Sequence, residues 1–120
     1  MTYDEIKNLL SNISDPSTKL EFVMDLGAHL SPVPDCAKCT EITGCASRVE
    51  ICRQGTRFYG DADSALVRGI VAIIIAMVDG KTPSEIKKMN IGQMFANLNI
   101  RLGAGRLNCI NSMIRFLHNL

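Results

Sequence analysis

The segment from Ser64 to Val78 constrains the fold more than any other part of the chain. It contains ten consecutive uncharged residues, Gly69 to Val78, and most of its aliphatic side chains are β-branched. Branching at Cβ favours a strand by propensity alone, but the length of the segment favours a buried helix. The uncharged run is shorter than the roughly 18 apolar residues that suggest a membrane span. We therefore expect a helix at the centre of the fold, apolar on nearly all of its faces.

The size and charge of the chain limit the range of functions. With 120 residues, of which 47% are hydrophobic, residues 1–120 suit a single domain with an ordinary core. Thirteen basic and twelve acidic side chains give a sequence pI of about 7.6. This balance gives no electrostatic reason to expect nucleic acid or an anionic membrane as a partner. A protein or a small molecule is the expected partner.

The N-terminus and the cysteine count predict a cytoplasmic location. The chain begins Met1-Thr2-Tyr3-Asp4-Glu5, which lacks the features of a secretory signal or a transit peptide, so we expect the mature protein to start here. An odd number of cysteines in a chain of this size favours free thiols in a reducing compartment. The five are Cys36, Cys39, Cys45, Cys52 and Cys109.

Capping patterns predict the N-terminal helices. Thr2 and Glu5 have the spacing of a capping box, and an apolar stripe follows them. Asp15-Pro16 combines an N-cap with a first-turn proline and begins a second helix, which ends near His29. The first stripe consists of Ile6, Leu9, Leu10 and Ile13.

Three further helices are predicted after the central one. The sequence Thr82-Pro83-Ser84-Glu85 begins a short helix that Asn90 and Gly92 close. A second short helix contains Met94, Phe95 and Leu98. The last helix begins at about Leu107 and has one apolar stripe, made of Leu107, Ile110, Met113, Ile114 and Leu117.

The middle of the chain predicts a loop followed by a hairpin. Residues 31–44 contain two prolines and two cysteines without periodicity, so we interpret them as a loop. Apolar and polar residues alternate from Ser47 to Arg53, and Thr56 to Tyr59 follows a Gln54-Gly55 break, which is typical of an antiparallel hairpin. The predicted fold class is α+β, with helices packed around a small antiparallel sheet of which two strands can be assigned.

Two segments of this chain carry a family resemblance. The first is Thr43-Gly44-Cys45-Ala46-Ser47-Arg48-Val49, and the second runs from Tyr59-Gly60-Asp61-Ala62-Asp63 through Val67-Arg68-Gly69. Together they resemble the SufE family, which has G-C-x-S-x-V followed by G-D-[SA]-D-x-x-[IL]-V-[KR]-G. The segments from Gly80 to Ile86 and from Gly105-Arg106 to Arg115 resemble later parts of the family, so the resemblance covers residues 15–119. It implies a SufE/IscU-like fold.

The resemblance also implies a function. SufE proteins are sulfur acceptors for cysteine desulfurases, so Cys45 is expected to take persulfide sulfur from a SufS-like desulfurase, and the protein is expected to stimulate that enzyme. An iron–sulfur cluster scaffold is the expected downstream acceptor. The pyridoxal phosphate (PLP) belongs to the desulfurase, so we expect no cofactor in this chain. On this interpretation the protein is an accessory carrier without turnover of its own.

Other candidate residues of the acceptor loop or partner surface are Gly44, Ser47, Asp61, Asp63 and Arg106. One of the two aspartates is also expected to cap the central helix, because a carboxylate suits a helix N-terminus. A cation such as Arg106 opposes the dipole at that end of a helix, which argues for a role other than stability. This chain has Cys109 where the family usually has glycine, and we expect Cys109 to be a partly buried helix residue.

Two alternatives come from other classes of protein. Cys36 and Cys39 form a C-x2-C pair, which is a common way to present two thiolates to zinc, so a zinc- or iron-binding module would use them with one further cysteine. An IscU-like cluster scaffold is the second alternative, but it distributes three cysteines and a histidine along the chain. The sequence contains no serine, histidine and aspartate in the order of a catalytic triad, no phosphate-binding loop and no HExxH motif. It therefore gives no support for hydrolytic or phosphoryl-transfer chemistry.

Overall fold

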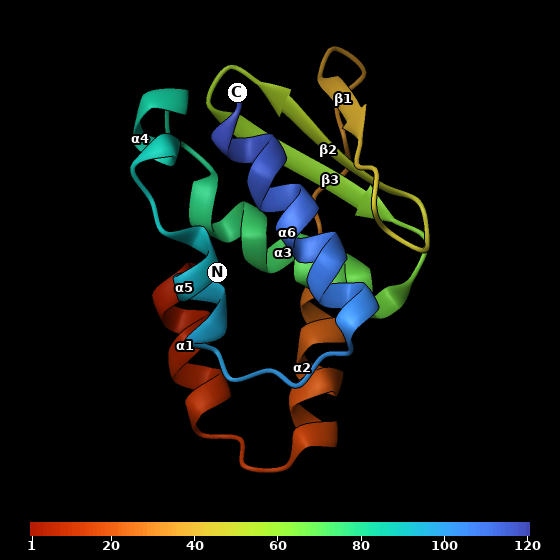
Figure 1. The fold of residues 1–120 in the computed structure, drawn as a ribbon, viewed down its shortest axis with the longest axis vertical. Coiled ribbons are helices and arrows are strands. Elements are labelled where there is room, and N and C mark those ends of the chain that lie inside the picture. Colours follow the sequence, from red (N-terminus) through yellow and green to blue (C-terminus); the bar gives the residue numbers. More distant parts are fainter.

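The computed structural model describes all residues, 1–120, as six helices and a three-stranded sheet. Figure 1 shows the strands gathered at the top of the view, with α1 and α2 at the bottom. The predicted α+β class is confirmed. The elements are α1 (Tyr3–Ser11), α2 (Pro16–Ala28), β1 (Lys38–Glu41), β2 (Val49–Gln54), β3 (Arg57–Ala62), α3 (Ala65–Val78), α4 (Pro83–Lys87), α5 (Ile91–Ala96) and α6 (Ala104–His118).

The sheet has the order β1-β2-β3 with both pairs antiparallel. The predicted hairpin is confirmed as β2 and β3, in which Gln54 pairs with Arg57 across a turn whose Gly55 has φ +62°. The interpretation of residues 31–44 as a loop is wrong in part, because β1 lies within them. All four residues of β1 are exposed, so this strand has no apolar alternation to reveal it.

Helix α3 forms the centre of the core, which confirms the expectation for the aliphatic segment. Eight of its residues are buried, among them Ile70, Ile73 and Ile74. It packs against β3 on one side, where Gly60 leaves room for the side chain of Val71. Ser64 caps the helix by accepting a hydrogen bond from the Val67 amide. Tertiary burial therefore overrides the strand propensity of the β-branched residues.

The crossing of α2 over α3 depends on two glycines. A Cβ on Gly27 would lie 2.5 Å from the backbone nitrogen of Gly69. A Cβ on Gly69 would overlap the carbonyl of Val23, which is itself fully buried. Real Cβ atoms do not approach backbone atoms so closely, so the two helices would have to separate. The absence of both side chains lets the backbones meet.

Three of the helix starts predicted from capping patterns are confirmed. Thr2 and Glu5 form a capping box on α1, Asp15 caps α2, and Thr82 and Glu85 form a second capping box on α4. The Thr2 backbone N–H donates to the Glu5 carboxylate at 3.0 Å, which lowers the pKa of Glu5, and the Thr82 backbone N–H lowers the pKa of Glu85 in the same way. The Thr18 hydroxyl lowers the pKa of Asp15.

The apolar stripes of the first and last helices are only partly confirmed. Helix α6 begins at Ala104, three residues before the predicted start, because its N-cap is Gly103 and no side chain marks it. Leu107 is 46% exposed and Leu9 is 43% exposed, although both were assigned to stripes. Both helices lie at the surface, where apolar residues at the margin of a stripe stay in solvent. No helix combines the length and the apolar character that crossing a membrane requires.

Candidate functional site

Cys45 lies in the loop that joins β1 to β2. The Ile42 backbone N–H donates to the Val49 carbonyl at 2.8 Å and closes the base of this loop. Gly44 has φ +90°, a conformation that residues with a Cβ rarely adopt. A Cβ at Gly44 would also lie 2.6 Å from Ser112 Oγ on α6. The sequence therefore needs glycine directly before Cys45 to let the loop lie against α6.

A surface cavity of about 410 Å³ opens between this loop, the start of α3 and the start of α6. Cys45, Ser47 and Arg106, which are distant in sequence, all contribute to its wall. Cys45 and Ser47 are half-buried, whereas Arg106 is exposed. The full lining consists of Cys45, Ala46, Ser47, Ser64, Val67, Gly103, Gly105, Arg106 and Cys109.

Cys45 is paired with Cys109 in a disulfide that links the loop to α6. Their Cα atoms are 4.5 Å apart. Cys109 is 4% exposed, so it is fully buried rather than partly buried as predicted. The expectation that the cysteines are all free thiols is wrong for these two, because loop packing brings together residues that are 64 positions apart in sequence. A free thiol at Cys45 requires reduction of this bond.

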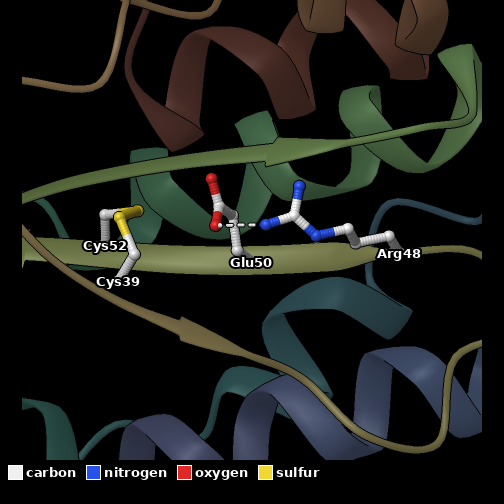
Figure 2. The surroundings of a disulfide bond; sticks show 4 residues. All are labelled: Cys39, Arg48, Glu50 and Cys52. Atoms are coloured by element: carbon white, nitrogen blue, oxygen red, sulfur yellow. Dashed lines mark hydrogen bonds and ion pairs between the residues drawn. A yellow bond between two sulfur atoms is a disulfide. The ribbon is translucent and has the colours of Figure 1, made fainter.

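Cys39 and Cys52 form a second disulfide, between β1 and β2 (Figure 2). They are direct partners in the strand register, and their Cα atoms are 3.9 Å apart. The sequence interpretation missed this pair because β1 was not recognised as a strand. Only Cys36 is free, and its sulfur accepts a hydrogen bond from the Gln54 amide at 2.7 Å.

The zinc- or iron-binding alternative assumed that Cys36 and Cys39 act as a pair, but the structure groups different residues. Cys39, Glu50 and Cys52 have potential ligand atoms within 4.8 Å of one another, and Cys36 is not in this cluster. Glu50 in turn pairs with Arg48 at 3.2 Å, as Figure 2 shows. A metal at this place would need both cysteines as thiolates and would compete with Arg48 for the carboxylate. The C-x2-C spacing of Cys36 and Cys39 does not by itself create the cluster.

The start of α6 gives the cavity a positive wall. Gly103 is the N-cap residue, no side chain caps the helix, and the first turn contains no acidic residue. Arg106 lies in this turn and forms none of the four ion pairs of the chain. Unsatisfied N–H groups and the helix dipole attract anions. The cavity that Cys45 lines therefore suits a negatively charged group.

Arg48 is the nearest cation to Cys45 in sequence, but its charge is used elsewhere. Its guanidinium pairs with Glu41 at 3.4 Å and with Glu50 at 3.2 Å, on the face of β2 that also bears Cys52. Arg48 does not line the cavity. Arg106 is thus the cation of the cavity, although it is much farther along the chain.

The two aspartates of the second motif do not line the cavity, and neither caps α3. Ser64 has that role, so the expectation that one aspartate is the cap is wrong. The Asp61 carboxylate lies 3.2 Å from Arg68 Nε without hydrogen-bond geometry, so charge alone joins them. The Asp63 backbone N–H donates to the Arg48 carbonyl at 3.1 Å, which holds the segment after β3 beside the loop that contains Cys45.

Sequence reasoning missed Cys109, Ser64 and Val67 as residues of the cavity. For Cys109 a usable pattern existed. Residues three apart on a helix share a face, so a cavity role for Arg106 implies that Cys109 faces the same cavity. No comparable pattern indicated Ser64 or Val67, whose positions depend on how α3 packs against the loop.

Comparison with known proteins gives a consistent family relationship. A family model described as SufE, Fe-S metabolism associated domain, matches residues 4–120. An uncharacterized SufE-like protein of Rhizobium meliloti is 30% identical, with 93% of this chain and 89% of the relative covered. The sulfur acceptor protein CsdE of Escherichia coli is 29% identical, with 94% and 83% covered. The solution structure of a hypothetical protein from Thermus thermophilus superposes with TM-score 0.77 at 13% identity, covering 99% of this chain and 94% of that one, and it indicates a shared fold.

Proposed function

Because the chain belongs to the SufE family, we propose that it accepts sulfur from a cysteine desulfurase and delivers it for iron–sulfur cluster assembly. The observation that carries this proposal is the position of Cys45, which lines a cavity together with an unpaired arginine. The relative named as a sulfur acceptor is similar over most of both chains, which supports the same role here.

Sulfur acceptance begins with the reduced protein. Once the Cys45–Cys109 bond is opened, the Cys45 thiolate attacks the outer sulfur of a persulfide on the desulfurase. The bond between the two donor sulfurs breaks, the desulfurase cysteine leaves as a thiolate, and Cys45 becomes the persulfide. No external oxidant or reductant is needed for this transfer.

The cavity favours the product of that transfer. A persulfide on Cys45 is anionic when deprotonated, and the wall formed by Gly103, Gly105 and Arg106 presents N–H groups and a cation to it. Ser47 supplies a hydroxyl to the same cavity. Partial enclosure also separates the outer sulfur from thiols in solution. These features suit a carrier that holds sulfur between two partners.

The family relationship supports a division of tasks between this chain and its partners. In this proposal the PLP chemistry that removes sulfur from cysteine belongs to a SufS-like partner, and the downstream acceptor is a cluster scaffold. The present chain acts as an accessory protein, with no turnover of its own. Its formal net charge of only +1 is consistent with protein partners rather than nucleic acid.

The test is sulfur loading by a cysteine desulfurase supplied with cysteine. We expect the reduced wild-type protein to gain about 32 Da, the mass of one sulfur, as a persulfide. Cys45→Ser should gain nothing and should not accelerate the desulfurase, because a hydroxyl cannot hold sulfane sulfur. Circular dichroism should show an intact fold. Cys36→Ser is the matched control, because it removes the exposed free thiol, and it should load like wild type. Unchanged loading of Cys45→Ser would refute the proposal.

A further inference from the structure

Cys109 places a second sulfur beside the proposed acceptor. It lies on α6, is 4% exposed, and is bonded to Cys45 in the structure. Both cysteines line the same cavity, and the disulfide lies where this cavity borders the hydrophobic core. Cys109 lies outside the two segments that carry the family motif, so the pairing is not a feature of that motif.

We propose that Cys109 is a resolving thiol, which releases the sulfur held on Cys45 as hydrosulfide. This inference rests on the proposed function, because it takes the Cys45 persulfide as its substrate. It extends that function by specifying the form in which sulfur leaves. The carrier would deliver sulfide, already reduced, rather than sulfane sulfur that a later step must reduce.

Atoms and electrons balance in this step without any group from outside the protein. As the Cys109 thiol gives its proton to the outer sulfur of the Cys45 persulfide, the resulting thiolate attacks Sγ, the bond from Sγ to the outer sulfur breaks, and hydrosulfide leaves with that proton. The new bond is the Cys45–Cys109 disulfide that the structure contains. The two cysteine sulfurs lose two electrons in total, and the outer sulfur gains them in passing from the sulfane to the sulfide state. No external oxidant or reductant takes part in this step.

Geometry supports attack on Sγ rather than on the outer sulfur. The two Cα atoms are 4.5 Å apart, so the backbone already permits the direct bond. The outer sulfur of a persulfide extends beyond Sγ, and the cavity of about 410 Å³ provides space for it. Arg106 precedes Cys109 by three residues and therefore shares its helix face. Its cation is available to the departing hydrosulfide.

Exposure separates the tasks of the two cysteines. Cys45 is half-buried on a loop and is accessible to a partner's persulfide, whereas Cys109 is buried on a helix. A buried thiol is protected from other electrophiles and reacts with what the loop brings to it. After release, a protein dithiol must reduce the Cys45–Cys109 bond before the next sulfur is accepted. That reductant would reach the bond from the side of Cys45.

A single-turnover experiment tests the resolving role. Reduced protein, freed of reductant under anaerobic conditions, is loaded by a catalytic amount of cysteine desulfurase with limiting cysteine. Hydrosulfide and the intact mass are then followed over time. We expect wild type to release stoichiometric hydrosulfide and to end about 2 Da below its reduced mass, as a disulfide requires. Cys109→Ala should keep the added mass of about 32 Da as a stable persulfide and release no hydrosulfide.

Two further variants make the result decisive. Cys109→Ser keeps the size of the side chain and should behave like Cys109→Ala, which covers the case that alanine disturbs the fold. Cys36→Ser should release hydrosulfide as wild type does. Equal persulfide lifetimes in wild type and Cys109→Ala would overturn the resolving role and leave the proposed function intact. Sulfur found on Cys109 would also overturn it. Failure of Cys109→Ala and Cys109→Ser to gain sulfur would instead refute the proposed function.

Discussion

The crossing of α2 and α3 and the cavity beside Cys45 differ in how closely their atoms approach. At the crossing, Gly27 and Gly69 bring two backbones together so tightly that a single Cβ would not fit. Around Cys45, a loop and a helix N-terminus leave a cavity of about 410 Å³. Glycine occurs in both regions, yet only at the crossing does it permit contact between helices. The stability of the fold and the proposed sulfur chemistry therefore depend on separate residues. Substitutions at the crossing should lower stability, and substitutions at the cavity should lower function.

The largest expected effect is that of Gly69→Ala at the crossing. The added methyl group would overlap the Val23 carbonyl, and backbone atoms cannot move aside without separating the helices. Overpacking usually costs about 1–3 kcal/mol, and we expect a loss of at least about 3 kcal/mol in the free energy of unfolding. Urea denaturation measures it.

Gly105→Ala is the matched control for this prediction. Gly105 lies in α6 and lines the cavity, and a Cβ there meets no atom within 4 Å. Alanine should raise the free energy of unfolding by up to about 0.5–1 kcal/mol, because glycine is a poor helix former. Equal stability of the two variants would contradict the conclusion that a methyl group fits at the cavity but not at the helix crossing.

Arg106→Ala should have a smaller effect, which weakens function without weakening the fold. Removing a cation from a helix N-terminus should leave stability unchanged or raise it by about 0.3–1 kcal/mol. Loss of the same interaction with an anionic persulfide should lower desulfurase stimulation about two- to fivefold, which is what that energy corresponds to in rate. Thermal unfolding and desulfurase turnover measure the two quantities.

The control for this prediction is Arg101→Ala, which removes an exposed arginine outside the cavity. It should leave desulfurase stimulation unchanged. Wild-type stimulation by Arg106→Ala, together with lower stability, would identify Arg106 as a structural residue. It would mean that the positive charge at the cavity does not contribute to function.

The smallest effect concerns the capping carboxylates, which lie far from the cavity. The folded pKa of Glu85 is below the ordinary value of 4.5, because the Thr82 N–H and hydroxyl favour the charged form. Its contribution to stability is therefore fully present above pH 4.5 and is lost as pH falls through the lower, folded pKa. Thermal unfolding between about pH 6 and about pH 3 should show a smaller decline for Glu85→Gln than for wild type.

Glu21→Gln serves as the control, because Glu21 is exposed and forms no capping hydrogen bond. It should follow the wild-type decline. A Glu85→Gln curve that also followed wild type would mean that the capping box of α4 does not contribute to the acid dependence.

Local sequence patterns predicted the helices well because the chemistry of a helix start is local. Asp15-Pro16 and the two capping boxes specify their helices without reference to the rest of the chain. The motif around Cys45 likewise pointed to a loop, and the structure places residues of that loop at the wall of a cavity. The start of α6 was missed because Gly103 offers no side-chain cap.

The cysteine pairs could not be predicted in the same way. Cys39 and Cys52 meet only through the register of β1, a strand with no buried residue, and Cys45 meets Cys109 only after the loop packs on α6. Such contacts are tertiary, and the spacing of cysteines does not encode them. The same holds for Ser64 and Val67, which join the cavity from α3.

Locating the transferred sulfur shows whether Cys45 is the thiol that accepts it. After brief incubation of the reduced protein with a cysteine desulfurase and cysteine, persulfides are alkylated and the peptides are mapped by mass spectrometry. We expect an additional sulfur of about 32 Da on the peptide that contains Cys45 at the earliest times. An additional sulfur that appears first on Cys36 or Cys39 would contradict it.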